Sequence, residues 1–382
     1  MLNMEMHILI GVLLACTVTG LPVKEKVFPN DIFTSLDYAL FENEVAYVYD
    51  DNKNLVKLTL EDDHVEQNAY ENNTVLEKSV LFYLYKRNNP IKPKQLYVDD
   101  KDALKNSNFD PTKPTRFITH GWKSSSTSES CILIRDVSKQ RYLFLFVTFL
   151  RLLLMFITSY IAAYLQVGDY NVIIVDWSAI SSMNYVSASM RVTVVGQYVA
   201  TMIDFLVKYG MNSWNTKIIG HSLGAHVAGI AAYNASSDID YVVGLDPALP
   251  GFRLAGPGSR ISKDDANYVE IIHTNGGVLG YLAAIGNIDF YPNGGQKQVG
   301  CGVDLGGSCS HSRSYQYFAE SITSHIGFLG KSCDSFSQFK SGLCNDTQAS
   351  IMGGHKPLFR ANGTYYLITN PSSPFAIEPL AM

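Results

Sequence analysis

The sequence predicts an α/β fold with a mostly parallel central sheet and helices on both faces. Apolar runs of buried-strand length, such as DYNVIIVDW and DYVVGLDPA, alternate with segments of helical apolar spacing. The stretch TKIIGHSLGAHVAGIAAY passes directly from such a strand into a helix. A chain of 382 residues with 47% hydrophobic content is long enough to bury a large core. Strands that alternate with helices in this way are typical of parallel sheets covered on both faces.

The predicted elements follow one another along the second part of the chain. SVLFYLYKRNNP is a strand ended by Pro90, and TRFITHGW is a second strand that enters a glycine-containing turn. DYNVIIVDW is a β-branched strand, and apolar side chains then recur at helical spacing between residues 188 and 208. After TKIIGHSLGAHVAGIAAY, the segments DYVVGLDPA and NYVEIIHT are two further apolar strands.

The charge balance gives no sign of a nucleic-acid surface. The chain has 30 Lys and Arg against 35 Asp and Glu, a net charge of -5. Acidic residues are concentrated in residues 21–77, where lysines are few and regular apolar repeats are scarce. We therefore expect no nucleic-acid partner and an acidic N-terminal extension over 21–77. A solvated leader is favoured over a regulatory pro-segment, since charge runs are usually solvated.

The N-terminus resembles a secretory signal. MHILIGVLLACTVTG is apolar, too short to span a membrane and followed by small residues, so we expect a signal peptide over residues 1–20 that is cleaved after Gly20. The prediction is therefore a secreted, extracellular protein. Four glycosylation sequons agree with this route: Asn72, Asn234, Asn345 and Asn362.

The cysteines fit an oxidising compartment. Five remain if Cys16 is removed with the signal. The close spacings of Cys301 with Cys309 and of Cys333 with Cys344 favour two small disulfide loops, which would leave Cys131 outside both.

The segment GHSLG indicates a serine nucleophile. It matches Gly-x-Ser-x-Gly at Gly220, Ser222 and Gly224, and it lies between a predicted strand and a predicted helix. A serine on so sharp a turn needs neighbours without side chains, because strand and helix approach each other closely. An ordinary glycine-rich turn is the alternative, and the strand-to-helix context argues against it.

Serine needs a histidine as base and a carboxylate to orient that histidine. Asp246 ends the strand after Ser222, at the same sheet edge, whereas Asp240 lies at the opposite end of that strand. Four histidines remain candidates for the base: His273, His311, His325 and His355. His273 ends a strand, His325 lies in a helical segment, and His355 is near the C-terminus. His311 follows Cys309 on a predicted loop, and spacing alone leaves the choice open.

Several ordered motifs together resemble the animal pancreatic-lipase family, in particular its insect neutral lipase and phospholipase A1-like branch. They are ITHGW, GHSLGAHVAG, GLDPA, YVEIIHT, DFYPNGG and CSHSRSYQYFAES, and they cover roughly residues 80–375. The resemblance implies an α/β-hydrolase fold and a catalytic Ser222, Asp246 and His311. It also implies an oxyanion hole made by the backbone N–H groups of Trp122 and Leu223. The catalytic domain is then expected over residues 78–376, followed by a tail over 377–382.

The sequence departs from that family in three places. The family's triacylglycerol lipases have a long disulfide-closed lid before the catalytic histidine, whereas CGVDLGGSC leaves seven residues between its cysteines. Pro257 and Ser262 replace acidic ligands of the family's calcium site, so we expect no metal and no cofactor. The family's C-terminal β-sandwich is not expected after YYLITNPSSPFA.

These departures favour a secreted serine carboxylic-ester hydrolase that acts on acyl lipids, either as a phospholipase A1 or galactolipase or as a neutral lipase. A triacylglycerol lipase and a catalytically silent lipid-binding or yolk-type protein are the alternatives. The expected partner is a lipid substrate at a membrane or micelle surface, and no obligate protein partner is inferred.

An anomalous apolar insert occupies residues 137–163. The segment 142–165 nearly reaches the 20 or so apolar residues of a membrane span, interrupted by Arg151. A span would place Trp122 and Ser222 on opposite sides of the membrane, and strands of one sheet could not then pair. Arg151 at the centre of the span would add about 2.5 to 3.5 kcal/mol to the free energy of insertion. A buried extra helix would need protein on every side.

Our hypothesis is that the insert is a translated intron. Codons for Ser138-Lys139 can contain a GTAAG donor, and codons for Ala162-Ala163 can contain a CAG acceptor in the same phase. Phe, Leu, Tyr and Ile are the residues that a T-rich intron would encode. Genomic sequence without a donor and an acceptor at these codons would reject the hypothesis. If the insert is present in the protein, we expect it to protrude and to promote aggregation.

Overall fold

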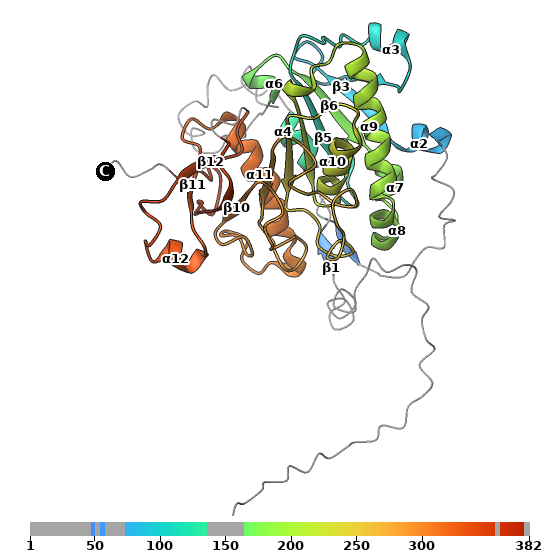
Figure 1. Ribbon diagram of the computed structural model, residues 1–382. Helices are drawn as coiled ribbons and strands as arrows, with labels where there is room; N and C mark the ends of the chain where they lie inside the picture. The colour runs from blue at the N-terminus through green and yellow to red at the C-terminus, as the bar shows by residue number, and fades with distance from the viewer. Residues whose placement is uncertain (1–46, 50–53, 58–72, 136–163, 356–359, 378–382) are drawn as a thin grey trace, which may run out of the picture. The chain divides into compact units, whose positions relative to one another are not determined.

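The computed structural model describes residues 47–49, 54–57, 73–135, 164–355 and 360–377, and Figure 1 shows the arrangement. Its main feature is a sheet of 11 strands in the order β12-β11-β13-β10-β9-β8-β7-β5-β6-β3-β4. Their bounds, in chain order, are β3 Leu81–Tyr85, β4 Lys94–Leu96, β5 Thr115–Thr119, β6 Asn171–Asp176, β7 Thr216–His221, β8 Tyr241–Leu245, β9 Val269–Ile272, β10 Ile288–Pro292, β11 Phe328–Ser332, β12 Ala349–Met352 and β13 Gly363–Leu367.

The inner strands of the sheet are parallel, as the sequence predicts. From β6 through β5, β7, β8, β9 and β10 to β13 every neighbouring pair is parallel. Antiparallel pairs occur only towards the two edges of this sheet, at β4, β3 and β6 and at β13, β11 and β12. In the register, Thr119 lies opposite Gly220, His221 opposite Leu245, and Leu245 opposite Ile272. The residues that follow these four strands therefore meet at one edge.

Helices cover both faces of the sheet. One face carries α2 (Asn73–Ser79), α7 (Ser178–Ser181), α8 (Tyr185–Met190), α9 (Val192–Lys208) and α10 (Leu223–Asn234). The other carries α4 (Glu129–Arg135), α6 (Tyr164–Val167) and α11 (Ser308–Thr323). Shorter elements complete this part of the chain: α3 (Lys101–Lys105), η2 (Ser213–Asn215), η3 (Leu305–Gly307) and α12 (Phe336–Lys340).

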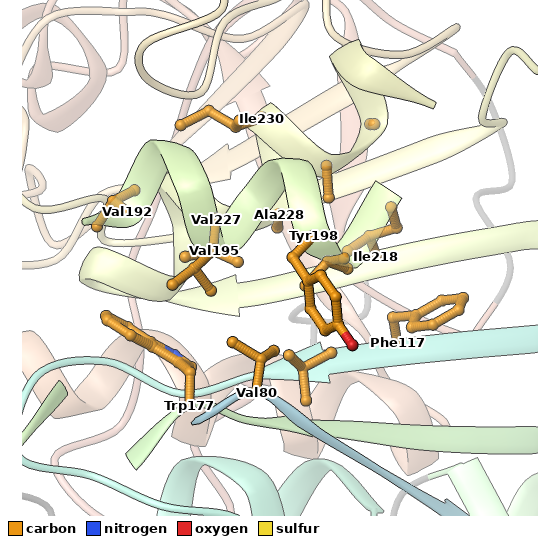
Figure 2. Packing of buried hydrophobic residues seen from close by; sticks show 14 of the residues in the cluster. Val80, Phe117, Trp177, Val192, Val195, Tyr198, Ile218, Val227, Ala228 and Ile230 are labelled. Atoms are coloured by element: carbon orange, nitrogen blue, oxygen red, sulfur yellow. The ribbon is translucent and has the colours of Figure 1, made fainter. Parts of the chain in front are cut away.

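The apolar strands are continuous runs because both faces of the sheet are buried. Successive strand residues point to opposite faces. Ile218 of β7 and Phe117 of β5 accordingly belong to the core cluster under α9 and α10, whereas Ile219 and Ile118 belong to the cluster under α11. Figure 2 shows the first cluster, in which strand residues meet Val195 of α9 and Val227 of α10.

The predicted helix over residues 188–208 is two helices. Residues 185–190 form α8, and α9 begins at Val192. α8 begins before residue 188 because the Asn184 side chain accepts a hydrogen bond from Ser187 N at 2.8 Å and caps the helix. The division lies at Arg191, the C-cap of α8, whose N–H donates to Ala188 O and Ser189 O.

The acidic extension contains some regular structure. β1 (Tyr47–Tyr49) and β2 (Leu55–Lys57) pair as a separate antiparallel two-stranded sheet. α2 crosses the boundary expected at residue 78, and its Leu76 is buried in the core. The expected signal peptide, Asn72, the whole insert over residues 137–163 and residues 378–382 of the expected tail lie outside the described residues.

The two ends that flank the insert are packed in the same layer. α4 ends at Arg135 and α6 begins at Tyr164, and both side chains are buried. The Arg135 guanidinium lies 4.2 Å from the Tyr85 ring centroid, and the Arg116 guanidinium lies 5.3 Å from that of Tyr164. Among the described residues, which leave out 136–163, no helix has the length and hydropathy of a membrane span.

A glycine permits the close approach of α9 and α10. A Cβ on Gly196 would lie 2.6 Å from Ile230 Cγ2 and 3.2 Å from Val227 O. The first distance is too short for any Cβ and the second is tight, so the Ile230 side chain or the backbone of α10 has to shift. α10 begins directly after Ser222.

We predict that Gly196→Ala lowers the free energy of unfolding by about 1–3 kcal/mol, because overpacking displaces one helix. Urea unfolding measures the change, and Gln197→Ala on the exposed side of α9 is the control, expected within about 0.5 kcal/mol of wild type. The cost of the alanine should shrink in an Ile230→Ala background. An equal cost in both backgrounds would contradict this contact.

Candidate active site

Ser222 lies on a strained turn between β7 and α10. Its backbone has φ 58° and ψ -124°, a conformation that costs on the order of 1–3 kcal/mol for a residue with a side chain. The N–H of Ser222 donates to Leu245 O at 3.0 Å, which ties the turn to β8. The side chain makes no capping hydrogen bond to α10, so the hydroxyl is not used to start the helix.

The glycines around Ser222 are required by backbone contacts. A Cβ on Gly220 would lie 2.0 Å from Gly224 O, and a Cβ on Gly224 would lie 2.3 Å from His120 O. A Cβ on Gly121 would lie 2.8 Å from Ser222 Cβ. Three chain segments therefore meet at the serine, and each contact is closer than a side chain allows.

Asp246 follows β8 and is held as an acceptor. Its carboxylate is fully buried, and Oδ1 accepts the N–H groups of Thr274 and Asn275 at 2.8 and 3.0 Å. A Cβ on Gly280 would lie 2.4 Å from the same oxygen, so the glycine leaves room for the carboxylate. Oδ2 remains for another donor.

His311 supplies that donor. Its Nδ1 lies 2.6 Å from Asp246 Oδ2, so Nδ1 carries the proton and Nε2 is left as the basic nitrogen. The imidazole packs against His221, with ring centroids 4.5 Å apart. Because His221 immediately precedes Ser222, this contact places the imidazole beside the serine turn.

The expected loop position of His311 was wrong in detail. His311 lies in the first turn of α11, which begins at Ser308. Asp304 starts the helix early, because its two carboxylate oxygens accept Cys309 N and Ser310 N, each at 2.9 Å. Charged acceptors are favourable at a helix N-terminus.

Trp122 and Leu223, the expected oxyanion donors, lie on either side of Ser222. Trp122 follows Gly121, the residue in contact with the serine, and its indole Nε1–H donates to Met183 O at 2.8 Å. Leu223 is the first residue of α10, where backbone N–H groups have no partner within the helix. The structure therefore brings Ser222, Asp246, His311, Trp122 and Leu223 to one edge of the sheet.

The other candidate residues lie in different settings. His273 is buried, with Nδ1 2.7 Å from Tyr281 O and Nε2 2.8 Å from Asp289 Oδ1, so both nitrogens are used in the core. His325 is exposed and lies outside the helical segment expected for it, because α11 ends at Thr323. His355 is exposed, and Asp240 pairs with Arg360 at the opposite end of β8.

Both expected disulfides are present, Cys301 with Cys309 and Cys333 with Cys344, and Cys131 is buried in α4. The sequon residues Asn234, Asn345 and Asn362 are exposed.

Between Pro257 and Ser262, where the resemblance would place calcium ligands, lies the guanidinium of Arg260. Arg260 donates to Ala255 O at 2.7 Å, to Ile261 O at 2.6 Å and to Ser262 Oγ at 3.1 Å. Burial raises the pKa of Asp265 to about 7, and its carboxyl accepts Ser262 N at 2.7 Å. These contacts hold the loop after Asp246.

Asp176 ties together two loops beside Trp122. Its Oδ2 accepts Ser126 N at 3.1 Å, and its Oδ1 accepts Ser178 N at 3.0 Å. Burial opposes the charge, but the hydrogen bonds that Ser126 and Ser178 donate to the carboxylate favour it, and the pKa of Asp176 lies below its ordinary value of 3.8. Sequence reasoning missed Asp176 and His221, because both act through tertiary contacts, and it missed the local cap that Asp304 forms at the start of α11.

We predict that Asp304→Ala lowers the free energy of unfolding by about 0.5–2 kcal/mol, because two N–H groups at the start of α11 lose their acceptor. Amide exchange at Cys309 and Ser310 should become faster. Asp100→Ala, which removes the 2.8 Å cap at Ala103 N of α3, is the matched control and should leave that exchange unchanged. Unaltered exchange in Asp304→Ala would contradict the role of Asp304.

A pH series tests Asp176. Because its folded pKa is lowered, its contribution to stability is complete above the unfolded pKa near 3.8 and is lost as the pH falls through the folded pKa. Asp176→Asn should therefore cost about 1–3 kcal/mol between pH 5 and pH 7, and the difference from wild type should narrow below about pH 4.

Urea midpoints at each pH measure this difference. Asp169→Asn, at an exposed ion pair, is the control and should change little. A difference that is constant down to pH 3 would contradict a lowered pKa.

Comparison with known proteins identifies the family of this chain. A family model described as Lipase matches residues 47–375. A pancreatic triacylglycerol lipase from Myocastor coypus is 34% identical over 286 residues, which cover 69% of this chain and 57% of the relative. The inactive pancreatic lipase-related protein 1 from Mus musculus is 32% identical over 326 residues, covering 77% of this chain and 63% of the relative.

The chain thus spans little more than half the length of several of these relatives. Among solved structures, an esterase from Pyrobaculum calidifontis matches with a TM-score of 0.28 and 13% identity, covering 50% of this chain and 65% of the other, a likeness too distant to bear on function. The family match extends over most of the chain, including every strand of the large sheet. This chain, with its α/β-hydrolase fold, belongs to the lipase family.

Proposed function

We propose that this chain is a secreted serine carboxylic-ester hydrolase that cleaves acyl esters of lipids. The observation that carries the proposal is the 2.6 Å contact between His311 Nδ1 and Asp246 Oδ2 beside the strained Ser222 turn. This contact fixes the tautomer that a base for serine needs. A glycine-rich turn without function would have no reason to lie beside such a pair.

The chemistry follows from this arrangement. Ser222 Oγ attacks the ester carbonyl while Nε2 of His311 takes the proton of the serine hydroxyl. Asp246 stabilises the imidazolium that forms. The carbonyl oxygen becomes negatively charged and faces the N–H groups of Trp122 and Leu223, which are fixed before the reaction. His311 then protonates the leaving alcohol. Water, activated by the same nitrogen, releases the acyl group from Ser222.

The short loop before His311 favours a phospholipase A1 or galactolipase over a triacylglycerol lipase. Cys301 and Cys309 close a loop that contains only the single turn η3, which is too short for a helical lid. Val303 and Leu305 on this loop are 89% and 57% exposed, which suits contact with a lipid surface. Larger polar head groups have easier access to the serine when the loop before the histidine forms no helical lid.

A catalytically silent protein is the second candidate, because a relative named as inactive is as similar to this chain as the lipases are. Overall identity therefore does not separate the two functions. The arrangement of Ser222, Asp246 and His311 favours the enzyme. The two disulfides support an extracellular location, and the proposed partner is a lipid at a membrane or micelle surface, with no cofactor.

We predict that Ser222→Ala lowers kcat for p-nitrophenyl butyrate by at least about 10⁴-fold, because the nucleophile is lost. Urea unfolding should show that the variant is folded. Wild-type rates on phosphatidylcholine, on monogalactosyldiacylglycerol and on trioctanoin then identify the substrate class.

The expected result is faster release of fatty acid from the phospholipid or the galactolipid than from trioctanoin. Faster hydrolysis of trioctanoin would favour the triacylglycerol lipase. A folded wild-type protein that hydrolyses none of these esters would support the silent protein instead.

A further inference from the structure

We propose that His120 is a positioning residue for the oxyanion hole, and that its imidazole sets the direction of the Trp122 N–H group. The inference rests on the proposed ester hydrolysis and adds a residue to that reaction. His120 is the first residue after β5 (Thr115–Thr119) and is fully buried.

The hydrogen bonds of His120 fix its tautomer. Nδ1 lies 3.0 Å from Gly121 O, and a carbonyl oxygen only accepts, so Nδ1 carries the proton. Trp177 N–H donates to Nε2 at 3.1 Å, so Nε2 has none. His120 is therefore a neutral imidazole that donates to one backbone group and accepts from another.

Asp176 does not displace this arrangement. Its Oδ1 lies 3.4 Å from His120 Nε2, farther than Trp177 N. The lone pair of Nε2 is already used by Trp177, and the carboxylate is used by Ser126 and Ser178.

The bond to Gly121 O acts on the next residue. Gly121 C=O and Trp122 N–H belong to one planar trans peptide unit, in which the oxygen and the hydrogen point in opposite directions. A donor that holds the oxygen on one side therefore holds the N–H on the other. Donation to the carbonyl also polarises the amide, which strengthens its N–H as a donor.

The imidazole is itself held rigidly. It stacks on the Trp177 indole with centroids 5.5 Å apart and an interplanar angle of 9°. Trp177 Nε1–H donates to His120 O at 2.9 Å, so the indole holds the residue from its backbone as well. Trp177 directly follows β6, which pairs with β5, and the position of the ring is thus set by the sheet.

Two isosteric variants separate the two bonds of His120. In His120→Asn the side-chain amide N occupies the place of Nδ1 and can still donate to Gly121 O. In His120→Gln the longer side chain reaches the place of Nε2 and can accept from Trp177 N–H, but no donor remains for Gly121 O. His120→Leu removes both.

The experiment measures kcat and KM for p-nitrophenyl butyrate and the inhibition constant of an alkyl trifluoromethyl ketone, which forms a tetrahedral oxyanion with serine. We expect His120→Gln and His120→Leu to lose about 10–100-fold in kcat and in ketone affinity, somewhat less than the loss of a whole oxyanion donor. KM of these variants should stay within about twofold of wild type. His120→Asn should retain most of the wild-type kcat and ketone affinity.

His226→Leu is the matched control. His226 is equally buried, has Nε2 2.7 Å from Ala248 O and Nδ1 3.3 Å from Ile261 N, and stacks on Phe252. The His226→Leu variant should lose stability, as His120→Leu does. Its kcat and ketone affinity per folded molecule should stay close to those of wild type. The comparison of Asn with Gln carries the test if the leucine variant is unfolded.

Equal kcat and ketone affinity in folded His120→Asn and His120→Gln would overturn the proposal, as would an equal loss in His226→Leu. A wild-type protein that hydrolyses no ester and forms no ketone adduct marks the failure of the proposed function, and the role of His120 falls with it. If the wild-type protein is active and the His120→Gln variant has the same kcat and ketone affinity, this inference alone fails.

Discussion

The constraint on which the structure depends is the close packing of backbone at the Ser222 turn. The end of β7, the start of α10 and the segment after β5 meet there at distances that no side chain fits, as Gly121, Gly220 and Gly224 show. Because these segments touch through backbone, the serine and both expected oxyanion donors have little freedom to move. The left-handed conformation of Ser222 is sustained by the parallel strands and helix that surround it.

The remaining groups are attached to this turn by hydrogen bonds from separate parts of the chain. Asp246 follows the neighbouring strand and is oriented by Thr274 and Asn275, which follow the next one. His311 comes from a helix whose start is fixed by Asp304. Each group thus has a rigid support, which is what electrostatic stabilisation of a transition state requires.

The sequence predicted the features that depend on local patterns. The strands were visible as apolar runs because both faces of the sheet are buried, and Ser222 was visible because its glycines are neighbours in the chain. Spacing alone left four histidines, and the choice of His311 needed the family resemblance. The early start of α11 was missed because Gly306 and Gly307, at φ 63° and 77°, resemble a loop until the Asp304 cap is seen. The packing of His221 on His311 depends on how α11 docks, which no local pattern records.

The central claim is that Ser222 is a nucleophile activated by His311. The most direct measurement is peptide mass spectrometry after reaction with a fluorophosphonate, which labels activated serines, on wild type and on His311→Ala. The account predicts a single label on Ser222 in wild type and a rate of labelling reduced at least about 10³-fold in the variant. A label on another serine, or labelling of Ser222 at the same rate without His311, would contradict it.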